Sequence, residues 1–396
     1  MIYLDNSSTT RQADEVTESM LRAMREDFGN PSSLHQLGLD AENMVTEARK
    51  EIAAAFGASP EEIVFNSGGT EGDNTVLQGA AYAGRRTGNR IITTKVEHPA
   101  VLESCERLAR EGFEIVYLNV DDRCMPDLNE LRDAINEETL LVSMMAVNNE
   151  VGTILPIREA AEIAHEHKVW FHTDAVQALG KIPLQHTGAD MITVSGHKIH
   201  GPKGIGAVYV RKGVRVLPLI VGGGQEKAQR SGTENVPGIV GLGRAAALMQ
   251  EELAECTRMR EAYQKDPGAK LTGMTAVRQY LLAGLKDQIK DIRVNSPESP
   301  AESAASVLNI SFLGTRGEVI LHTLEADGIY VSTGSACSAH KKGRSHVLTA
   351  MGLSDREIEG AVRFSLSRYN TIEEMDVVID RTAQAVRRFR RLGSFR

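Results

Sequence analysis

The run Met191-Ile192-Thr193-Val194-Ser195-Gly196-His197-Lys198-Ile199-His200-Gly201 holds an apolar, partly β-branched stretch that changes abruptly to small and polar residues. This composition predicts a buried strand over Met191–Val194 that ends where the polar residues begin. Similar apolar runs recur through the first two-thirds of the chain. They predict further strands at Glu62–Phe65, Arg90–Thr94, Glu114–Leu118, Leu140–Met144, Val169–His172 and Gly206–Val210. Helical patterns separate most of them, so we predict an α/β fold with a mostly parallel, seven-stranded sheet covered on both faces.

Lys198 lies directly after the strand at Met191–Val194, and Asp174 closely follows the predicted strand Val169–His172. Ligands of such sheets gather at the carboxyl ends of the strands. A lysine that burial deprives of its proton can form a Schiff base. An aspartate that keeps a pyridine nitrogen protonated supplies the second requirement of pyridoxal 5'-phosphate (PLP) chemistry. The pair therefore predicts a PLP enzyme, although Asp174 considered alone is typical of a helix N-cap.

The composition is that of an ordinary globular enzyme with two to three domains: 396 residues, 41% hydrophobic and 25% charged. A net charge of −8 gives no electrostatic case for nucleic acid as the main ligand. No signal peptide and no apolar run near the ~20 residues of a membrane span are visible. The four cysteines, Cys105, Cys124, Cys256 and Cys337, are widely scattered. We therefore expect reduced thiols, a cytoplasmic location, no disulfide framework and no metal site.

The last third of the chain predicts a smaller α/β domain. A long helical stretch is expected at about 236–263 and a polar loop at 264–273, after which helical and strand patterns start again. The strands are expected at Ser306–Phe312, Ile329–Val331 and Val362–Ser365, and the helices at Glu318–Asp327, Asp355–Ala361 and Glu373–Phe389. We expect residues 14–260 to form a large PLP-binding domain. Residues 1–13 and 261–396 would form a small domain with a loop at about 332–345.

The basic stretch at 387–391 ends the last predicted helix. Cations are favoured at a helix C-terminus, which explains this stretch without a function. A docking site for an acidic partner is the alternative.

A glycine-rich turn follows the strand at Glu62–Phe65 and opens a helix: Asn66-Ser67-Gly68-Gly69-Thr70-Glu71-Gly72-Asp73-Asn74. Glycines let the backbone approach an anion, and the free N–H groups of a helix N-terminus favour negative charge. We expect Gly69 and Thr70 to hold a phosphate. A plain glycine turn with Thr70 as the N-cap is the alternative.

Other polar residues also follow predicted strands. Gln177, one turn after Asp174, could donate a hydrogen bond to a ring hydroxyl. His98 could stack on a planar ring and move protons, although a histidine before a proline is also typical of a turn. Asn149 suits a polar site or a turn equally. Thr233 lies in a second run suited to phosphate, Arg230-Ser231-Gly232-Thr233, which could instead be a surface loop.

Two further residues have a distinctive setting. Arg363 places a cation inside an apolar strand, where a substrate carboxylate or a structural ion pair would satisfy it. Cys337 lies among small residues and is followed by His340, Lys341 and Lys342. Nearby cations favour the thiolate, so we predict a nucleophile at Cys337 in preference to a packed core residue.

Together these motifs resemble the cysteine desulfurases of the NifS/IscS group, which are fold-type I PLP enzymes. The resemblance covers most of the chain and rests on the number and the order of the motifs. They are Tyr3–Asn6, Asn30–Ser33, Ser67–Asn74, Glu97–Pro99, Val147–Gly152, His172–Gln177, Ser195–Lys203, Gly232–Asn235, Ser335–Cys337 and Arg363–Leu366.

The resemblance implies a role for each of the candidate residues. Lys198 would carry PLP, Asp174 would pair with the ring nitrogen, and Gln177 would contact the ring hydroxyl. His98 would stack on the ring and help with proton transfer. Thr70, Ser195 and His197 would hold the phosphate, Asn149 and Arg363 would bind the substrate, and Cys337 would accept the sulfur. Thr233 would reach the phosphate from the other subunit of a homodimer.

The resemblance also implies conversion of L-cysteine to L-alanine, with sulfur passed from a Cys337 persulfide to an iron–sulfur scaffold or a tRNA-thiolation protein. A selenocysteine lyase, another PLP lyase or aminotransferase, and a non-catalytic sulfur relay are the alternatives. The chain departs from the family pattern at Ser7-Ser8, in the segment 264–273 and at its basic C-terminus.

Overall fold

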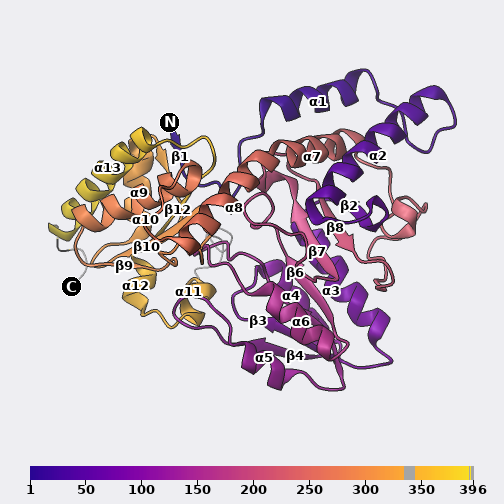
Figure 1. Ribbon diagram of the computed structural model, residues 1–396, viewed down its shortest axis with the longest axis horizontal. Coiled ribbons are helices and arrows are strands. Elements are labelled where there is room, and N and C mark those ends of the chain that lie inside the picture. The colour runs from indigo at the N-terminus through magenta and orange to yellow at the C-terminus, as the bar shows by residue number, and fades with distance from the viewer. Residues whose placement is uncertain (334–343, 392, 394–396) are drawn as a thin grey trace.

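The computed structural model describes residues 1–333, 344–391 and 393, and Figure 1 shows them as two groups of helices and strands. The larger group is built on a seven-stranded sheet with the order β2-β8-β7-β6-β5-β3-β4. Its strands are β2 (Ile63–Asn66), β3 (Arg90–Thr94), β4 (Glu114–Leu118), β5 (Thr139–Ser143), β6 (Trp170–Asp174), β7 (Met191–Ser195) and β8 (Gly206–Val210). The predicted mostly parallel sheet is confirmed. Only β8 runs antiparallel to its two neighbours, β2 and β7.

The pleat of this sheet divides its side chains between two hydrophobic cores. Successive residues of a strand point to opposite faces. Accordingly, Ile92 and Ile192 belong to one core, whereas their neighbours Ile91 and Met191 belong to the other. The helices of this group are α1 (Asp14–Arg25), α2 (Gln36–Phe56), α3 (Gly69–Gly84), α4 (Pro99–Arg110), α5 (Leu128–Ala134), α6 (Ile157–Glu166) and α7 (Val236–Leu248). Residues of α3 and α4 pack in the second core, and those of α2, α6 and α7 in the first.

The smaller group, at the left of Figure 1, contains two small sheets. Its strands are β1 (Ile2–Tyr3), β9 (Ile292–Val294), β10 (Val307–Phe312), β11 (Ile329–Tyr330) and β12 (Ala361–Ser365). Its helices are α8 (Gln250–Lys265), α9 (Gly273–Gln288), α10 (Gly317–Ala326), α11 (His346–Ala350), α12 (Asp355–Glu359) and α13 (Ile372–Arg391). β12, β10 and β9 form an antiparallel sheet, and β1 pairs in parallel with β11.

The helical stretch expected at about 236–263 is confirmed, and the structure divides it into two helices. The chain forms α7 and α8, which meet at Met249 and run on to Lys265. Met249 is buried and contacts the tight turn at Gly180, whose φ of +77° requires a glycine. The sequence carries neither proline nor glycine at this position to signal the division.

The sheet brings the polar strand ends to one edge. β3, β5, β6 and β7 are parallel, so their carboxyl ends meet there. The carboxyl end of β2 lies at the same edge. β2 is antiparallel to β8, and β8 is antiparallel to β7, so β2 runs in the same direction as β7. No helix in the described part of the chain has the length and apolar character of a membrane span.

Candidate active site

A cavity of about 300 Å³ lies at this edge of the central sheet. Apart from Thr233 and Cys337, every residue predicted for the site lines it. These residues are Gly69, Thr70, His98, Asn149, Asp174, Gln177, Ser195, His197, Lys198 and Arg363. Ser7 and Ser8 line the cavity as well. The structure thus brings together residues that lie far apart in the sequence, although their individual roles stay predictions.

Lys198 is the last residue of a short 3-10 turn, Gly196–Lys198, that follows β7. Its Nζ donates hydrogen bonds to the carbonyl oxygens of Ser7 and Ser8, the latter at 2.9 Å. The N-terminal segment is held there because Asn6 and Ser7 donate to Ser365 at the end of β12. The amine therefore lies where the two groups of elements meet.

Asp174 ends β6, and its Oδ1 accepts a hydrogen bond from the Val176 N–H at 2.9 Å. Burial raises the pKa of Asp174 to about 6, and the Val176 N–H and the Lys198 cation limit this rise. At neutral pH the carboxyl group is therefore mostly ionised, although it is only 5% exposed. A buried carboxylate of this kind needs a cationic partner.

His98 is the N-cap of α4, and its Nδ1 accepts a hydrogen bond from the Ala100 N–H at 3.1 Å. Burial lowers the pKa of His98 to about 4, with smaller contributions from Lys198 and His346. The ring is therefore neutral at pH 7, and because Nδ1 is the acceptor, its proton lies on Nε2. The sequence allowed two roles for His98, a turn residue or a residue of the site. The structure is compatible with both, because His98 caps α4 and also lines the cavity.

The cavity continues beside Gly69 and Thr70 into a second hollow that Ser67, Ser195, His197 and Lys203 help to line. Here α3 begins at Gly69. A Cβ at Gly69 would lie 2.8 Å from Val176 Cγ2, so the close approach requires a glycine. Free N–H groups at the start of a long helix, together with a lysine, favour an anion. This part of the site could hold a phosphate.

Arg363, on β12, is only 3% exposed and reaches the cavity from the smaller group of elements. Its guanidinium group donates to Asn149 O at 2.9 Å, Asp5 Oδ1 at 3.0 Å and Ser8 Oγ at 2.8 Å. Its Nε is buried without a hydrogen-bond partner. Asp5 thus forms the structural ion pair that was one of the two alternatives for Arg363 in the sequence. The Arg363 side chain nevertheless lines the cavity.

The sequence reasoning missed several polar groups around the cavity. Asp73, Glu150 and His346 line it, and Glu97 directly precedes His98. Glu97 Oε1 accepts from Thr94 Oγ1 at 2.7 Å and from the Met145 N–H at 3.0 Å. Burial raises the pKa of Glu97 to about 8, so it is protonated at neutral pH. Burial and the charge of Asp174 also raise the pKa of Asp73.

Two predicted residues lie elsewhere. Thr233 is exposed in the segment between β8 and α7 and does not line this cavity. Cys337 lies outside the described residues.

Comparison with known proteins shows where the chain belongs. Residues 2–378 match the Aminotransferase class-V family. A cysteine desulfurase IscS from Methanosarcina thermophila is 44% identical over 394 residues, covering 99% of this chain and 93% of the relative. A solved structure titled NifS-like protein superposes with a TM-score of 0.88 at 40% identity, covering 98% of this chain and 99% of that one. One titled "SspA in complex with cysteine" gives 0.79 at 33% identity, covering 94% and 100%.

The fold, the cavity and these matches define a PLP-dependent enzyme of the class-V aminotransferase family. Within that family, the chain belongs to the cysteine desulfurases of the NifS/IscS group. The resemblance found in the sequence is thereby confirmed.

The cavity fits PLP. It presents a primary amine, a buried carboxylate, an amide and an anion-binding end within one space. Ser7 Oγ and Asp73 Oδ1 are buried there without partners, so a bound polar group could satisfy them. Across residues 1–333 and 344–391, no cluster of His, Cys, Asp or Glu is arranged to hold a metal ion.

Proposed function

We propose that this enzyme converts L-cysteine to L-alanine and transfers the sulfur to Cys337, from which a protein acceptor takes it. The single observation that carries the proposal is the cavity that joins Lys198, Asp174 and Arg363. These three residues supply an amine, a counter-ion for a ring cation, and a cation for a carboxylate. PLP chemistry on an amino-acid substrate uses all three.

When bound, PLP supplies an electron sink for negative charge at the substrate Cα. Asp174 would keep the ring nitrogen protonated, and Gly69, Thr70, Ser195 and His197 would hold the phosphate. Arg363 would bind the substrate carboxylate with help from Asn149. Lys198 Nζ would carry PLP and then move the proton of the substrate Cα, and the neutral His98 ring would stack on the cofactor.

The sulfur step needs a nucleophile, and the cations after Cys337 in the sequence favour its thiolate. The thiolate attacks the substrate sulfur, so an S–S bond forms while the bond from that sulfur to Cβ breaks. The electron pair of the broken bond stays with the carbon, which takes up protons and leaves as alanine. Cysteine and the Cys337 thiol thus give alanine and a Cys337 persulfide.

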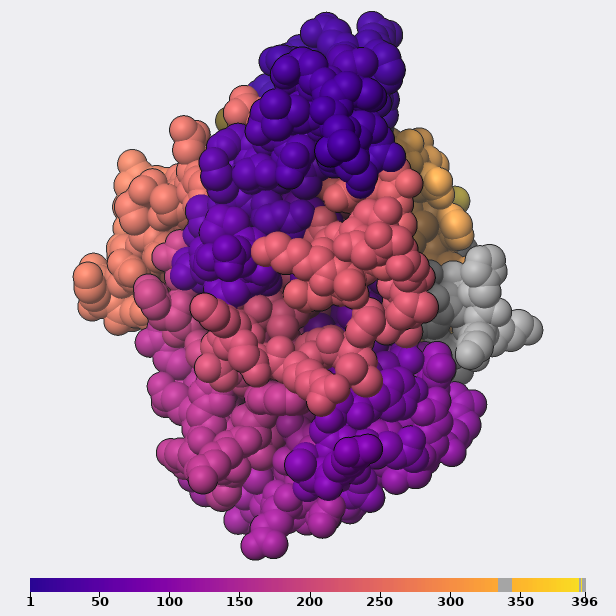
Figure 2. Space-filling model, turned by 90° about the vertical axis from the view of Figure 1, so that its right-hand side faces the viewer, coloured from indigo at the N-terminus to yellow at the C-terminus, as the bar shows by residue number. Residues whose placement is uncertain are grey.

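We further propose a homodimer in which Thr233 completes the phosphate site of the partner subunit. Thr233 is exposed and lies beyond the reach of its own cavity. Large apolar side chains are exposed on two segments, 28–39 and 219–221. They are Phe28, Leu34, Leu37, Leu39, Leu219, Ile220 and Val221. Figure 2 shows the segment before α7 lying against the N-terminal helices on one face of the molecule. An exposed apolar surface of this kind favours association.

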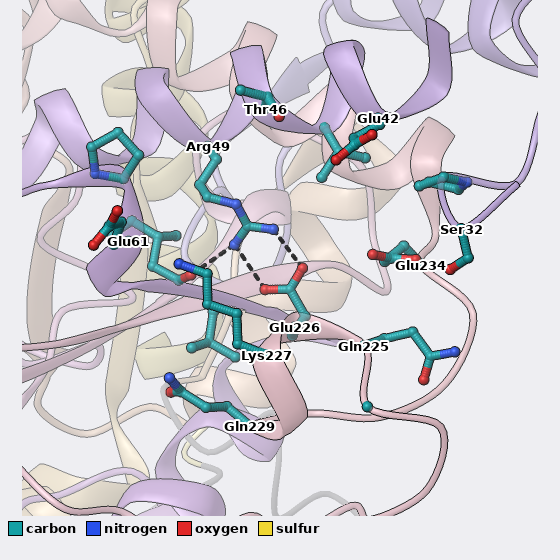
Figure 3. Close-up of a pocket in the computed structure, with 16 residues that line it drawn as sticks. Ser32, Glu42, Thr46, Arg49, Glu61, Gln225, Glu226, Lys227, Gln229 and Glu234 are labelled. Atoms are coloured by element: carbon teal, nitrogen blue, oxygen red, sulfur yellow. Dashed lines mark hydrogen bonds and ion pairs between the residues drawn. The ribbon is translucent and has the colours of Figure 1, made fainter. Parts of the chain in front are cut away.

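The segment that presents Thr233 is firmly anchored. Figure 3 shows Arg49 of α2 paired with Glu226, at 2.6 Å, in a cavity of about 430 Å³. Glu226 Oε2 also accepts from the Phe65 N–H at 3.0 Å. Further along the segment, Arg230 pairs with Glu71 of α3 at 2.9 Å. A segment fixed at two points can hold an exposed threonine in a defined place.

The acceptor proposed for the sulfur is an iron–sulfur scaffold or a tRNA-thiolation protein, in keeping with the IscS name of several relatives. We also propose a cytoplasmic location, supported by three free, buried thiols at Cys105, Cys124 and Cys256. The division into domains at 14–260, and at 1–13 with 261–396, stays a proposal. It is supported by a separate hydrophobic core that joins Leu4 to residues such as Leu281 and Phe364.

The test is Cys337→Ser in the full-length enzyme loaded with PLP. We expect the variant to bind L-cysteine and change its visible spectrum, yet form no protein persulfide, as measured by thiol-labelling mass spectrometry. A persulfide on Cys105, Cys124 or Cys256 would contradict the role of Cys337. Cys105→Ser is the matched control, because its thiol is buried in a core with a pKa raised to about 12 and should not react.

A further inference from the structure

A second polar cluster lies beneath the backbone of Lys198, separate from the cavity. A hollow of about 10 Å³ is lined by Lys181, His200, Glu252 and Arg368, among others. Lys181 Nζ donates a hydrogen bond to the main-chain carbonyl oxygen of Lys198 at 2.9 Å. The residue that bears the reactive amine is thus held by a second lysine that the mechanism does not use.

Three carbonyls at the Lys198 turn, those of His197, Lys198 and His200, accept hydrogen bonds from other parts of the chain. Thr10 donates to His197 O through both its N–H and its Oγ1, each at 2.9 Å. The Ala13 N–H donates to His200 O at 2.9 Å. Lys181 supplies the corresponding donor for Lys198 O, and it does so from a charged side chain. Hydrogen bonds from charged donors are roughly twice as strong as neutral ones.

Lys181 shares its hollow with residues from the other group of elements, Glu252 of α8 and Arg368 after β12. Burial lowers the pKa of Lys181, and Glu252 of α8 and Cys256 offset this effect. Arg368, which follows β12, donates to Leu248 O at the end of α7 at 3.2 Å. The next residue, Tyr369, packs against the His200 ring with the centroids 5.0 Å apart. The cluster therefore joins α8 and the chain after β12 to the turn that carries Lys198.

We propose that Lys181 is a positioning residue for Lys198, and that Glu252 couples it to the smaller group of elements. The inference rests on the proposed function, because it needs Lys198 to be the reactive lysine. The carbonyl of Lys198 fixes the orientation of its peptide plane and so the direction in which its side chain leaves the turn. A misplacement of about 1 Å in a reacting group can cost about a hundredfold in rate.

The test is Lys181→Met, which keeps the length of the side chain and removes its donor. Absorbance titration of the cofactor-free protein measures the PLP affinity. Mass spectrometry after borohydride reduction measures the fraction of PLP that is trapped on Lys198. Assays of alanine formation give kcat and KM. We expect about tenfold weaker PLP binding and at least about a tenfold lower kcat. The KM for L-cysteine should change by less than about threefold, since Arg363 is untouched.

Arg278→Met is the matched control. Arg278 is a fully buried cation that donates to two main-chain carbonyls, Val307 O at 2.8 Å and Pro297 O at 2.7 Å, in the smaller group of elements. Its loss should lower thermal stability while PLP affinity and kcat stay unchanged. Equal losses of PLP affinity in both variants would mean that Lys181 contributes only to the stability of the fold, and would overturn the proposal.

Glu252→Gln leaves the Lys181 side chain unaltered, removes the negative charge near it, and provides the second variant if Lys181→Met does not fold. This variant should bind PLP about threefold more weakly than the unaltered enzyme. Unchanged PLP affinity and kcat in the Lys181→Met or Glu252→Gln enzyme would overturn the proposal and leave the desulfurase function standing. Failure of the unaltered enzyme to bind PLP or make alanine would instead remove the proposed function, and this inference with it.

Discussion

The cavity beside the Arg49–Glu226 pair and the active-site cavity differ in their buried titratable groups. In the larger one, of about 430 Å³, Arg49 and Glu226 form an ion pair that also involves backbone groups of β2. In the smaller one, of about 300 Å³, Ser7 Oγ, Asp73 Oδ1 and Arg363 Nε are buried without hydrogen-bond partners, and so is Glu234 Oε2 at the larger one. In the smaller cavity the buried carboxyl and imidazole groups also have strongly displaced pKa values. Buried groups with displaced pKa values, and neither cavity size nor unsatisfied polar atoms, therefore mark the site of chemistry.

The largest effect that would sharpen this comparison is expected from Asp174→Asn. The amide keeps the shape of the side chain but cannot hold a ring cation, so the electron sink weakens. We expect kcat for alanine formation to fall by about 10²–10³-fold, a loss typical of a missing electrostatic group. Steady-state kinetics with saturating PLP measures it, and a loss below tenfold would contradict the role of Asp174.

Arg363→Lys is expected to act on substrate binding. A lysine keeps the charge but cannot contact a carboxylate with two nitrogens. The KM for L-cysteine should rise about 10- to 100-fold, whereas kcat should change less. Arg293→Lys, on β9 of the same small sheet, serves as the control because Arg293 pairs with Glu357 away from the cavity. A similar KM for the Arg363→Lys and unaltered enzymes would remove Arg363 from the substrate site.

Glu97→Gln tests the buried acid beside His98 through the pH dependence of stability. The folded pKa of about 8 lies above the ordinary value of 4.5, so the folded protein keeps a proton that the unfolded chain has lost. The unaltered protein should therefore lose stability as pH rises from about 4.5 to about 8, by up to about 1.4 kcal/mol per pH unit. Urea unfolding of both cofactor-free proteins should show an advantage for the Glu97→Gln variant that grows up to pH 8 and then levels off. A constant difference across this range would exclude a neutral Glu97.

The smallest effect on turnover is expected in the larger cavity. Glu226→Gln leaves Arg49 without its charged partner, which should cost about 3 kcal/mol of stability for so buried a pair. With saturating PLP, kcat should stay within about twofold of the unaltered enzyme, because the Arg230–Glu71 pair still anchors the segment that presents Thr233 and no group in the active-site cavity changes. Thermal unfolding and alanine assays measure the two effects. A kcat loss as large as that of Asp174→Asn would remove the distinction between the two cavities.

The sequence predicted the active-site cavity well wherever a polar residue follows a strand directly. Lys198, Asp174 and His98 each come just after an apolar run, and the parallel sheet brings such positions to one edge. Gly69 and Thr70 carried a second signal, the glycine turn that opens a helix.

Other features of the site and the fold depend on packing contacts that cannot be recognised in a single sequence. Glu97 adjoins His98 in the same motif, yet nothing in its neighbours shows that its carboxyl group is buried and protonated. His346 reaches the cavity from α11, a five-residue helix too short for a periodic pattern. Lys181 lies between two predicted strands, and only the fold reveals that it contacts Lys198 O. The break at Met249 likewise has no local signal.

The measurement that tests the central claim most directly is the visible spectrum of the purified PLP-bound enzyme before and after addition of L-cysteine, with alanine assayed in the same sample. The unaltered enzyme should be yellow, change its spectrum and release alanine, whereas Lys198→Ala should release none. A yellow enzyme that makes no alanine, or a Lys198→Ala variant that still makes it, would contradict the account.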